Sequence, residues 1–377
     1  MVRLQLLLHC ALNPMTTNFA QTNRRTFLKT VTAASAGLAL AGTTFAEEKN
    51  AARKIKLGLD NFSVRAMKWN ASQLIDYAAK LKTDSLFLTD LDCYENFEES
   101  YLKDLKKKAD DNGLQIHVGS WSICPTSKFF KNKWGTAEEH CALGIRIAKT
   151  LGSPVFRVIL GMGDDRKSVG GIEARMADTV KVCQASRTRA LDAGVKIAIE
   201  NHAGDMQAWE LVTLIEEAGK DYVGANIDSG NACWTMEDPL ENLEILGPYV
   251  CTTSLRDSMV WENENGAVVQ WTAMGEGNVD FKKYFARFAE LCPGIPVHIE
   301  CISGFPRELP YNKKDFWNVW PKARAKDFAK FIALAKTGKA IPPHHSPNNE
   351  AEQEYQKSDI ERSLKYCKEV LGLGLKT

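Results

Sequence analysis

The segment "KIAIENHAGD", Lys196–Asp205, changes within ten residues from an apolar strand pattern to a run of polar side chains. Residues 197–199 are isoleucine, alanine and isoleucine, which is typical of a strand buried on both faces of a parallel sheet. Glu200, Asn201 and His202 follow directly. Proteins built on parallel strands bind ligands at the carboxyl ends of those strands. The segment therefore predicts a core strand that carries part of a functional site.

The same alternation of strand and helix recurs on both sides of this segment. Stretches with helical spacing, several of them ending in glycine, separate the apolar runs. Together with 195–200, the strand-like runs are 54–60, 84–90, 114–121, 154–161, 223–228, 249–255 and 296–300. Eight such units over about 285 residues fit an α/β fold of one (β/α)8 TIM barrel, which typically takes about 250 residues.

A doubly wound sheet is the competing architecture for alternating strands and helices. It is disfavoured because no G-x-G-x-x-G follows the first strand, and "GMGDDR" at 161–166 has the wrong glycine spacing. We expect the barrel to occupy 47–339. Residues 340–377 are expected to form a Pro-rich linker and a C-terminal helical extension. Apolar residues share one face of that helix over 359–373, which predicts packing on the outside of the barrel.

The first 46 residues have the pattern of a targeting segment. Two adjacent arginines in "TNRRTFLKT" (22–30) precede a run of small apolar residues, and "TTFA" (43–46) has the small residues of a cleavage site. This resembles a twin-arginine signal peptide and predicts export to the periplasm. The apolar run is shorter than the roughly 20 residues that cross a bilayer, so no stable membrane span is expected.

Charge and cysteine content narrow the classes of partner. Removing residues 1–46 takes away four of 48 basic residues and none of 47 acidic ones, which leaves 44 against 47. Nucleic-acid binding needs a concentrated basic surface, so no nucleic-acid partner is expected. Nine of the ten cysteines lie after the leader, and none forms a C-x-x-C pair. We interpret them as mostly buried thiols.

Two other predicted strands end in a carboxylate, as the strand before Glu200 does. Asp228 ends the strand in "ANIDSGN", and Glu300 ends the strand in "HIE". One acidic residue at a strand end is more often a helix cap or an ion-pair partner. Three at the mouth of one barrel would repel one another unless they shared a cation or a proton, which favours a metal site.

These residues lie in motifs that resemble a known family. The motifs "IAIENH", "IDSGN", "TSLRDS", "MGEGNVDF" and "HIE" are similar in order and spacing to the sugar phosphate isomerase/epimerase group of xylose-isomerase-like TIM barrels, in the AP endonuclease 2 superfamily. The resemblance implies one divalent metal ion held by Glu, Asp, His and Glu at the ends of strands five to eight. Glu200, Asp228 and Glu300 match three of these ligands. Ser254 stands at the histidine position.

The serine departs from the pattern because a hydroxyl binds divalent metals more weakly than an imidazole. With Ser254 as a weak ligand, Mn²⁺ or Mg²⁺ is favoured over Co²⁺ or Zn²⁺. His202 is a second candidate ligand. Loss of the metal altogether stays open as an alternative.

The resemblance implies proton abstraction next to a carbonyl, with Glu200 and Glu300 as the acid/base pair. His202 is expected to contact substrate or transfer a proton. Arg256 is expected to offset developing negative charge or to bind a polar substrate, although an ion pair with Asp257 is nearly as consistent with the pattern. Among further substrate contacts we expect a hydrogen bond from Asn231 and stacking of the sugar on Trp121 and Trp234.

Export bears on the substrate, because phosphorylated sugars are cytoplasmic. The sequence thus favours an isomerase or epimerase of a small-molecule carbohydrate that is free or oxidised. One alternative is a 3-keto-glycoside lyase that uses the same first step and ends in β-elimination. Another is a non-catalytic periplasmic sugar-binding barrel. Trp261 and Trp271 bracket "ENENGAVVQ" (262–270), which is expected to form a hairpin over the barrel. The sequence leaves homo-oligomerisation open.

Overall fold

The computed structural model describes residues 55–376, so the predicted signal peptide lies outside the described residues. Eight parallel strands form the barrel in the order β10-β1-β2-β3-β4-β5-β6-β7. Each matches one strand expected from the sequence. They are β1 (Leu57–Asp60), β2 (Ser85–Leu88), β3 (Gln115–Ser122), β4 (Val155–Ile159), β5 (Lys196–Glu200), β6 (Val223–Ile227), β7 (Val250–Thr253) and β10 (Val297–Ile299).

The barrel closes between the first and last strands of this order. Beyond the end of β7, the Leu255 amide donates to the His298 carbonyl oxygen at 2.8 Å, and the Glu300 amide donates to the Leu255 carbonyl oxygen at 2.9 Å. These two bonds satisfy backbone groups that an open sheet edge would leave unpaired. The predicted (β/α)8 barrel is confirmed.

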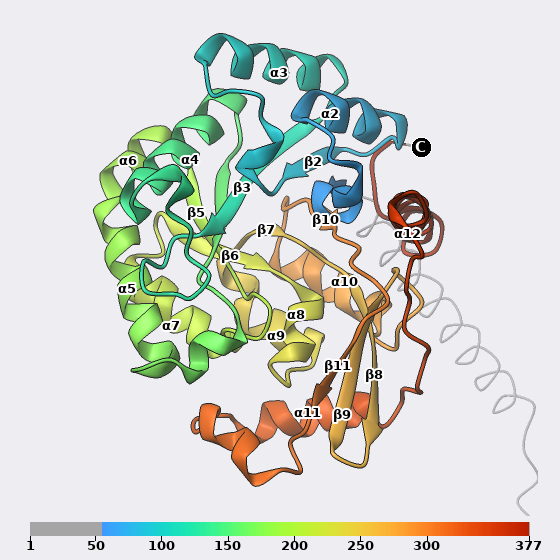
Figure 1. Cartoon of the computed structure of the whole chain (residues 1–377). Helices are drawn as coiled ribbons and strands as arrows, with labels where there is room; N and C mark the ends of the chain where they lie inside the picture. Colours follow the sequence, from blue (N-terminus) through green and yellow to red (C-terminus); the bar gives the residue numbers. More distant parts are fainter. Residues whose placement is uncertain (1–54, 377) are drawn as a thin grey trace, which may run out of the picture. The chain divides into compact units, whose positions relative to one another are not determined.

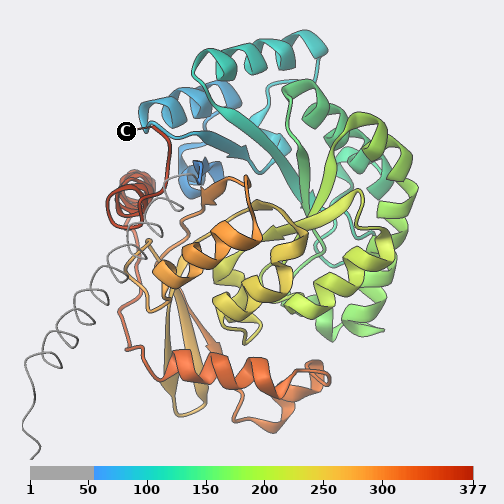
Figure 2. The ribbon, with the colours of Figure 1, turned by 180° about the vertical axis from the view of Figure 1, so that it is seen from behind.

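Helices surround the strands, as Figures 1 and 2 show from opposite sides. Their ends follow local capping rules. Asn70 and Thr136 each begin a helix with a capping box, and Gly152 ends one at φ 72°. The helices are α2 (Ala71–Lys80), α3 (Glu99–Asp111), α4 (Ala137–Leu151), α5 (Gly171–Ala185), α6 (Arg187–Ala193), α7 (Ala208–Ala218), α8 (Ser229–Trp234), α9 (Pro239–Leu246), α10 (Phe281–Leu291), α11 (Ala325–Ala335) and α12 (Asn349–Glu369).

The segment between β7 and α10 forms the expected hairpin, and a strand that follows β10 extends it into a sheet. Strands β8 (Asp257–Asn263) and β9 (Gly266–Thr272) pair antiparallel, and β11 (Pro306–Leu309) adds to β9. This three-stranded sheet has its own apolar cluster, to which Phe331 of α11 contributes. Figure 1 shows the sheet and α11 at one side of the barrel.

The C-terminal helix packs on the outside of the barrel, as the sequence predicted. The Ala66 amide donates to Gln356 Oε1 at 2.9 Å, and the Gly374 amide donates to the Ile55 carbonyl oxygen at 2.9 Å. Helix α12 begins at Asn349, ten residues before the apolar face that marked it in the sequence. Asn348 caps it, accepting from the Ala351 amide, and Glu, Gln and Ala in the first turns favour a helix without an apolar stripe.

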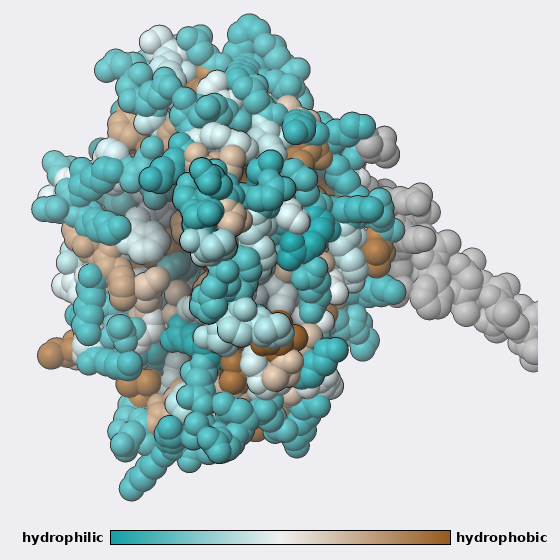
Figure 3. Space-filling view, turned by 45° about the vertical axis from the view of Figure 1, so that its right-hand side comes forward, coloured by the Kyte–Doolittle hydropathy of each residue, from teal (hydrophilic) through white to brown (hydrophobic). Residues whose placement is uncertain are grey.

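The nine described cysteines are all free thiols, and eight of them are buried, which confirms their interpretation. Within residues 55–376, no helix is both long and apolar enough to cross a membrane. Figure 3 shows mostly hydrophilic residues on one face of the surface, with apolar residues scattered among them.

Candidate active site

Three carboxylates meet at the carboxyl end of the barrel, as the sequence predicted. Glu200 is the last residue of β5, while Asp228 and Glu300 directly follow β6 and β10. All three are buried, and one oxygen from each lies within 4.8 Å of the others. Hereafter these three residues are called the acidic triad. Asp228 also begins α8, since its Oδ1 accepts from the Gly230 amide at 2.8 Å.

Arg256 lies directly against the acidic triad. Its Nη2 donates to both Asp228 Oδ2 and Glu300 Oε2, and its guanidinium lies 4.3 Å from the ring centre of Trp271. Burial by itself disfavours the charged guanidinium, but attraction to Asp228 and then Glu300 outweighs it, so the pKa of Arg256 is raised. The alternative pairing of Arg256 with Asp257 is not formed, because Asp257 accepts from the backbone amides of Gly275 and Gly277.

A second arginine, Arg157 on β4, holds Glu200. Arg157 Nε donates to Glu200 Oε2 at 2.6 Å, and its Nη1 donates to the Ser120 carbonyl oxygen at 3.0 Å. Asn226 Nδ2 donates to the same Glu200 oxygen at 2.6 Å. Sequence reasoning missed Arg157. Its signal was a charged residue inside the apolar strand "VFRVI", since a buried charge requires a partner.

The hydroxyl of Ser254, the residue at the expected histidine position, forms two hydrogen bonds. Its hydroxyl donates to Asp60 Oδ2 at 3.0 Å and accepts from Asn226 Nδ2 at 3.3 Å. Asp60 ends β1 and is fully buried, so it is a fourth carboxylate at the mouth. Burial, and then repulsion from Glu300, raises the pKa of Asp60 well above its usual range. Asp60 also ended its predicted strand in a carboxylate, the same signal that identified the triad.

Asn231 bridges two members of the acidic triad. Its Nδ2 donates to Asp228 Oδ2 at 2.7 Å and to Glu200 Oε1 at 3.1 Å. Its Oδ1 is buried without a partner among the described residues. A buried acceptor without a donor is costly, so a substrate hydroxyl or a water is the expected partner of this oxygen.

Burial makes the negative charges of Asp228 and Glu300 unfavourable. Burial is the largest cause that raises the pKa of Asp228 to about 8, and Glu200 and Glu300 add repulsion that Arg256 partly offsets. Burial likewise raises the pKa of Glu300, with repulsion from Glu200 as a further cause. The arginines therefore compensate the triad only in part, and a proton or another cation would relieve the remainder.

His202 lies on the wall of the site. Its Nδ1 is 2.7 Å from the Gly161 carbonyl oxygen, and its ring meets Trp121 edge-on at a centroid distance of 5.6 Å. Burial, followed by repulsion from Arg157, lowers the pKa of His202 to about 3. The ring is therefore neutral. With Nδ1 donating to the carbonyl, Nε2 is left as an acceptor.

A pocket of about 220 Å³ opens above these groups. Trp234 and Trp271 stack on one another at 4.1 Å, and Phe305 packs edge-on against both. Of the acidic triad, Glu300 lines the pocket. The other lining residues are Phe62, Thr89, Asp90, Trp121, Arg157, Met162, His202, Ala203, Asn231, Trp234, Arg256, Trp271, Ile302 and Phe305.

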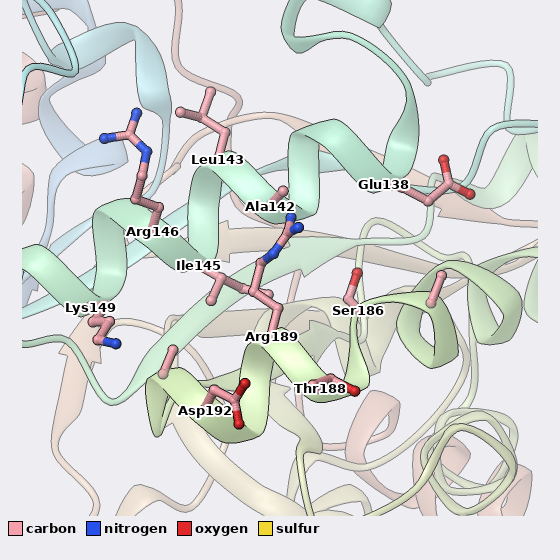
Figure 4. Close-up of a pocket in the computed structure, with 12 residues that line it drawn as sticks. Glu138, Ala142, Leu143, Ile145, Arg146, Lys149, Ser186, Thr188, Arg189 and Asp192 are labelled. Carbon is pink, nitrogen blue, oxygen red and sulfur yellow. The ribbon is translucent and has the colours of Figure 1, made fainter.

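Other features of the barrel lie apart from this pocket. A larger groove, of about 810 Å³, runs on the outer surface between α4 and α6, where Arg146, Lys149 and Arg189 line it (Figure 4). His117 and His298 are buried in the barrel interior, and the centres of their rings lie 4.7 Å apart. His117 Nδ1 lies 2.8 Å from the Thr252 hydroxyl oxygen. The acidic triad does not line the outer groove, and neither do Arg157 and Arg256.

The fold and the sequence agree on the family of this chain. The profile of the xylose isomerase-like TIM barrel family matches residues 75–314, and the chain belongs to that family. A sequence search of curated proteins found no match.

Solved structures with similar folds include several sugar-modifying enzymes. A D-psicose 3-epimerase crystallised with D-fructose is 15% identical with a TM-score of 0.54, and the alignment covers 84% of this chain and 100% of the epimerase. An L-ribulose 3-epimerase is 16% identical with a TM-score of 0.52, and the alignment covers 83% of this chain and 96% of that epimerase. The IOLI protein with a bound zinc atom is 14% identical with a TM-score of 0.52, and the alignment covers 76% of this chain and 100% of the IOLI chain. At these identities, the likeness establishes the fold.

The donor chemistry of the acidic triad suits a divalent cation. Carboxylate oxygens are the ligands that Mg²⁺ and Mn²⁺ prefer, and those of Glu200, Asp228 and Glu300 are close enough to share one ion. Two of them are already in contact with Arg256, and the Ser254 hydroxyl is directed at Asp60. A buried acidic triad that could bind a metal is therefore present.

Proposed function

We propose that this protein is a carbohydrate isomerase or epimerase that moves a proton on a carbon next to a carbonyl group. The observation that carries the proposal is the grouping of Glu200 and Glu300 with two buried arginines at the floor of an aromatic pocket. Two carboxylates can remove a proton from carbon and return one, while positive charge beside them stabilises the enediolate formed between the two steps.

The acid/base roles divide according to the environment of each carboxylate. Glu300 lines the pocket, and burial raises its pKa, which suits a group that both accepts and returns a proton. Glu200 is held by Arg157 and Asn226, so it is fixed in position as the second member of the pair. Neutral His202 would accept a hydrogen bond from a sugar hydroxyl through Nε2, and the free Oδ1 of Asn231 would accept another.

A divalent metal ion, with Mn²⁺ or Mg²⁺ favoured, is proposed as the cofactor. Glu200, Asp228 and Glu300 would hold it. When bound, such an ion polarises a carbonyl and its neighbouring hydroxyl and so lowers the barrier to proton loss. The protein's own groups would bind the sugar, exclude water and carry the protons.

The proposed substrate is a free or oxidised sugar without a phosphate. Both pocket arginines are already paired with carboxylates, and no lysine is among the described residues that line the pocket. In this structure, the residues that line the pocket therefore offer a phosphate no unpaired cation. The proposed export through the twin-arginine route agrees with this, because a periplasmic enzyme meets sugars rather than their phosphates. The aromatic wall of Trp121, Trp234 and Phe305 offers apolar faces for a sugar ring.

The test is solvent proton exchange on carbon. The protein, with and without added Mn²⁺, is incubated in D₂O with a panel of neutral ketoses and 3-keto-glycosides, and deuterium uptake is followed by NMR. We expect exchange with at least one sugar and a loss of about 100-fold or more in Glu200→Gln and Glu300→Gln, the scale of general acid/base catalysis. Glu138→Gln, in the outer groove, is the control and should exchange like the wild type.

Two other results would assign a different function. Release of the aglycone from a 3-keto-glycoside, lost in the same two variants, would assign the lyase, because elimination shares the proton-abstraction step. Sugar binding that both variants retain, with no exchange on any panel member, would assign the binding protein and contradict the proposal.

A further inference from the structure

The contacts of Arg256 are those that a metal ion would make. One nitrogen of its guanidinium contacts an oxygen of Asp228 and an oxygen of Glu300 at the same time. A divalent ion bound by those oxygens would lie about 2.0–2.6 Å from each of them. An ion and the Arg256 nitrogen placed on the same two oxygens would therefore overlap.

The charge of the cluster leads to the same conclusion. The ionised acidic triad brings three negative charges, and Arg157 and Arg256 bring two positive ones. Asp60, whose pKa burial raises well above its usual range, is counted as neutral. A divalent ion added beside both arginines would leave a net positive charge in a buried site. An ion that takes over the contacts of Arg256 would leave the triad and Arg157 neutral. Since an uncompensated buried charge is strongly unfavourable, exchange is favoured over coexistence.

The surroundings accommodate Arg256 but leave it incompletely bonded. A Cβ placed on Gly230 would lie 2.4 Å from Arg256 Cγ, so the glycine provides the space that the arginine stem occupies. The guanidinium packs on Trp271, whose indole nitrogen donates to the Gly230 carbonyl oxygen at 3.0 Å. Arg256 Nε is buried without a partner among the described residues. Arg256 therefore has a defined position, but its Nε donates no hydrogen bond to the described residues.

We propose that Arg256 and a divalent cation are alternative occupants of the acidic triad, so that Arg256 is a built-in competitor that weakens metal binding. The inference concerns the site of the proposed function, but metal binding can be measured without any substrate. Exchange on sugars that fails while the competition holds would reject the proposed function alone. Exchange that succeeds while the competition fails would reject this inference alone.

The test is titration of the metal-free protein with Mn²⁺ by calorimetry, for the wild type and the variants Arg256→Met, Gly230→Ala and Arg307→Met. Arg256→Met removes the charge. Gly230→Ala keeps the charge but displaces the arginine stem. Both are expected to bind one Mn²⁺ at least about tenfold more tightly than the wild type, a gain of about 1.4 kcal/mol. Arg307→Met removes a cation that packs on Trp234 outside the triad, and its affinity should be unchanged.

Thermal unfolding with and without Mn²⁺ shows whether each variant is folded before its Mn²⁺ affinity is compared. Arg256→Met leaves three buried carboxylates with less compensation, so Mn²⁺ should raise its Tm more than it raises that of the wild type. If Arg256→Met does not fold, Gly230→Ala decides. A folded Arg256→Met or Gly230→Ala variant with wild-type Mn²⁺ affinity would overturn the inference, as would an equal gain in Arg307→Met.

Discussion

Single residues decide which groups face the acidic triad. The Ser254 hydroxyl bonds to Asp60 and Asn226, although its position in the sequence matches a metal ligand. Arg157 and Arg256, from β4 and from the segment after β7, supply the positive charge instead. The site therefore contains two ion-paired arginines, and Ser254 stands at the position where the family resemblance implied a histidine.

Replacing Ser254 with alanine tests its role. The variant removes the hydroxyl that donates to Asp60 Oδ2, and an unsatisfied buried acceptor costs about 1–3 kcal/mol. We expect that loss in the free energy of unfolding, measured with urea, and no change in Mn²⁺ affinity. A weaker Mn²⁺ affinity in Ser254→Ala would show instead that the hydroxyl reaches the ion.

Glu237 gives a pH prediction away from the triad. It is buried, it accepts from the Ala208 amide and from Thr235 and Asn242, and burial is the largest cause that raises its pKa to about 8. Its folded pKa is therefore above its unfolded value. Such a group favours folding fully below its unfolded pKa, and that contribution is lost as pH rises through about 8.

The wild type should accordingly lose stability between about pH 5 and pH 8, with Glu237 contributing at most about 1.4 kcal/mol per pH unit, the value for one proton. Glu237→Gln cannot titrate and should show a shallower decline. Urea unfolding of both proteins across this range measures the difference. Parallel profiles would rule out Glu237 as a source of the slope.

The elements of the barrel depend on close contacts between helix and strand. Gly144 on α4 faces Phe156 on β4, and a Cβ on the glycine would lie 2.0 Å from the phenyl ring. Both residues are buried, so the ring has no open direction in which to move. The glycine is present to allow the close approach of helix and strand rather than to favour the helix.

Gly144→Ala should therefore destabilise the protein although alanine is the better helix former. The gain in helix propensity is about 1 kcal/mol, and overpacking a core costs typically about 1–3 kcal/mol, so a net loss is expected. The control is Gly194→Ala, at φ 65° with no atom within 4 Å, where the loss should be the left-handed strain of about 1 kcal/mol. Both values come from urea unfolding. A stabilised Gly144→Ala would contradict the packing argument.

For the molecule as a whole, the C-terminal segment fastens the start of the barrel. After α12 the chain returns to β1 and β2, where the Leu375 amide donates to Asp84 Oδ2 at 2.8 Å. Asp84 Oδ2 also accepts from the Leu57 amide at 2.9 Å, so one carboxylate joins both ends of the described chain.

Two leucines of this segment form a matched pair. Leu373 is 3% exposed within the core, and Leu375 is 54% exposed. Leu373→Ala should lower the free energy of unfolding by about 2–5 kcal/mol, the range for truncating a buried leucine. Leu375→Ala should change it by less than about 0.5 kcal/mol, as surface substitutions do. Equal effects in urea unfolding would show that the tail does not belong to the cooperative unit.

The sequence by itself determined the barrel and the members of the acidic triad. Eight apolar runs alternate with helical segments, and a parallel barrel places every strand end at one mouth. The carboxylates of Glu200, Asp228 and Glu300 could therefore be grouped although they are far apart in the chain. Asp60 also ends a predicted strand in a carboxylate, but it was not assigned to the site. The start of α12 was not predicted, because its first turns lack an apolar stripe.

Only the tertiary structure decided how those carboxylates are neutralised. Arg157 pairs with Glu200 across neighbouring strands, and Arg256 reaches Asp228 and Glu300 from the segment after β7. Each pairing depends on the direction of side chains from strands far apart in the sequence. Whether a buried charge meets a metal, a proton or a guanidinium depends on the atoms within a few ångströms of it. Local sequence patterns do not contain that information, because they fix the strand on which a residue lies but not its neighbours across the barrel.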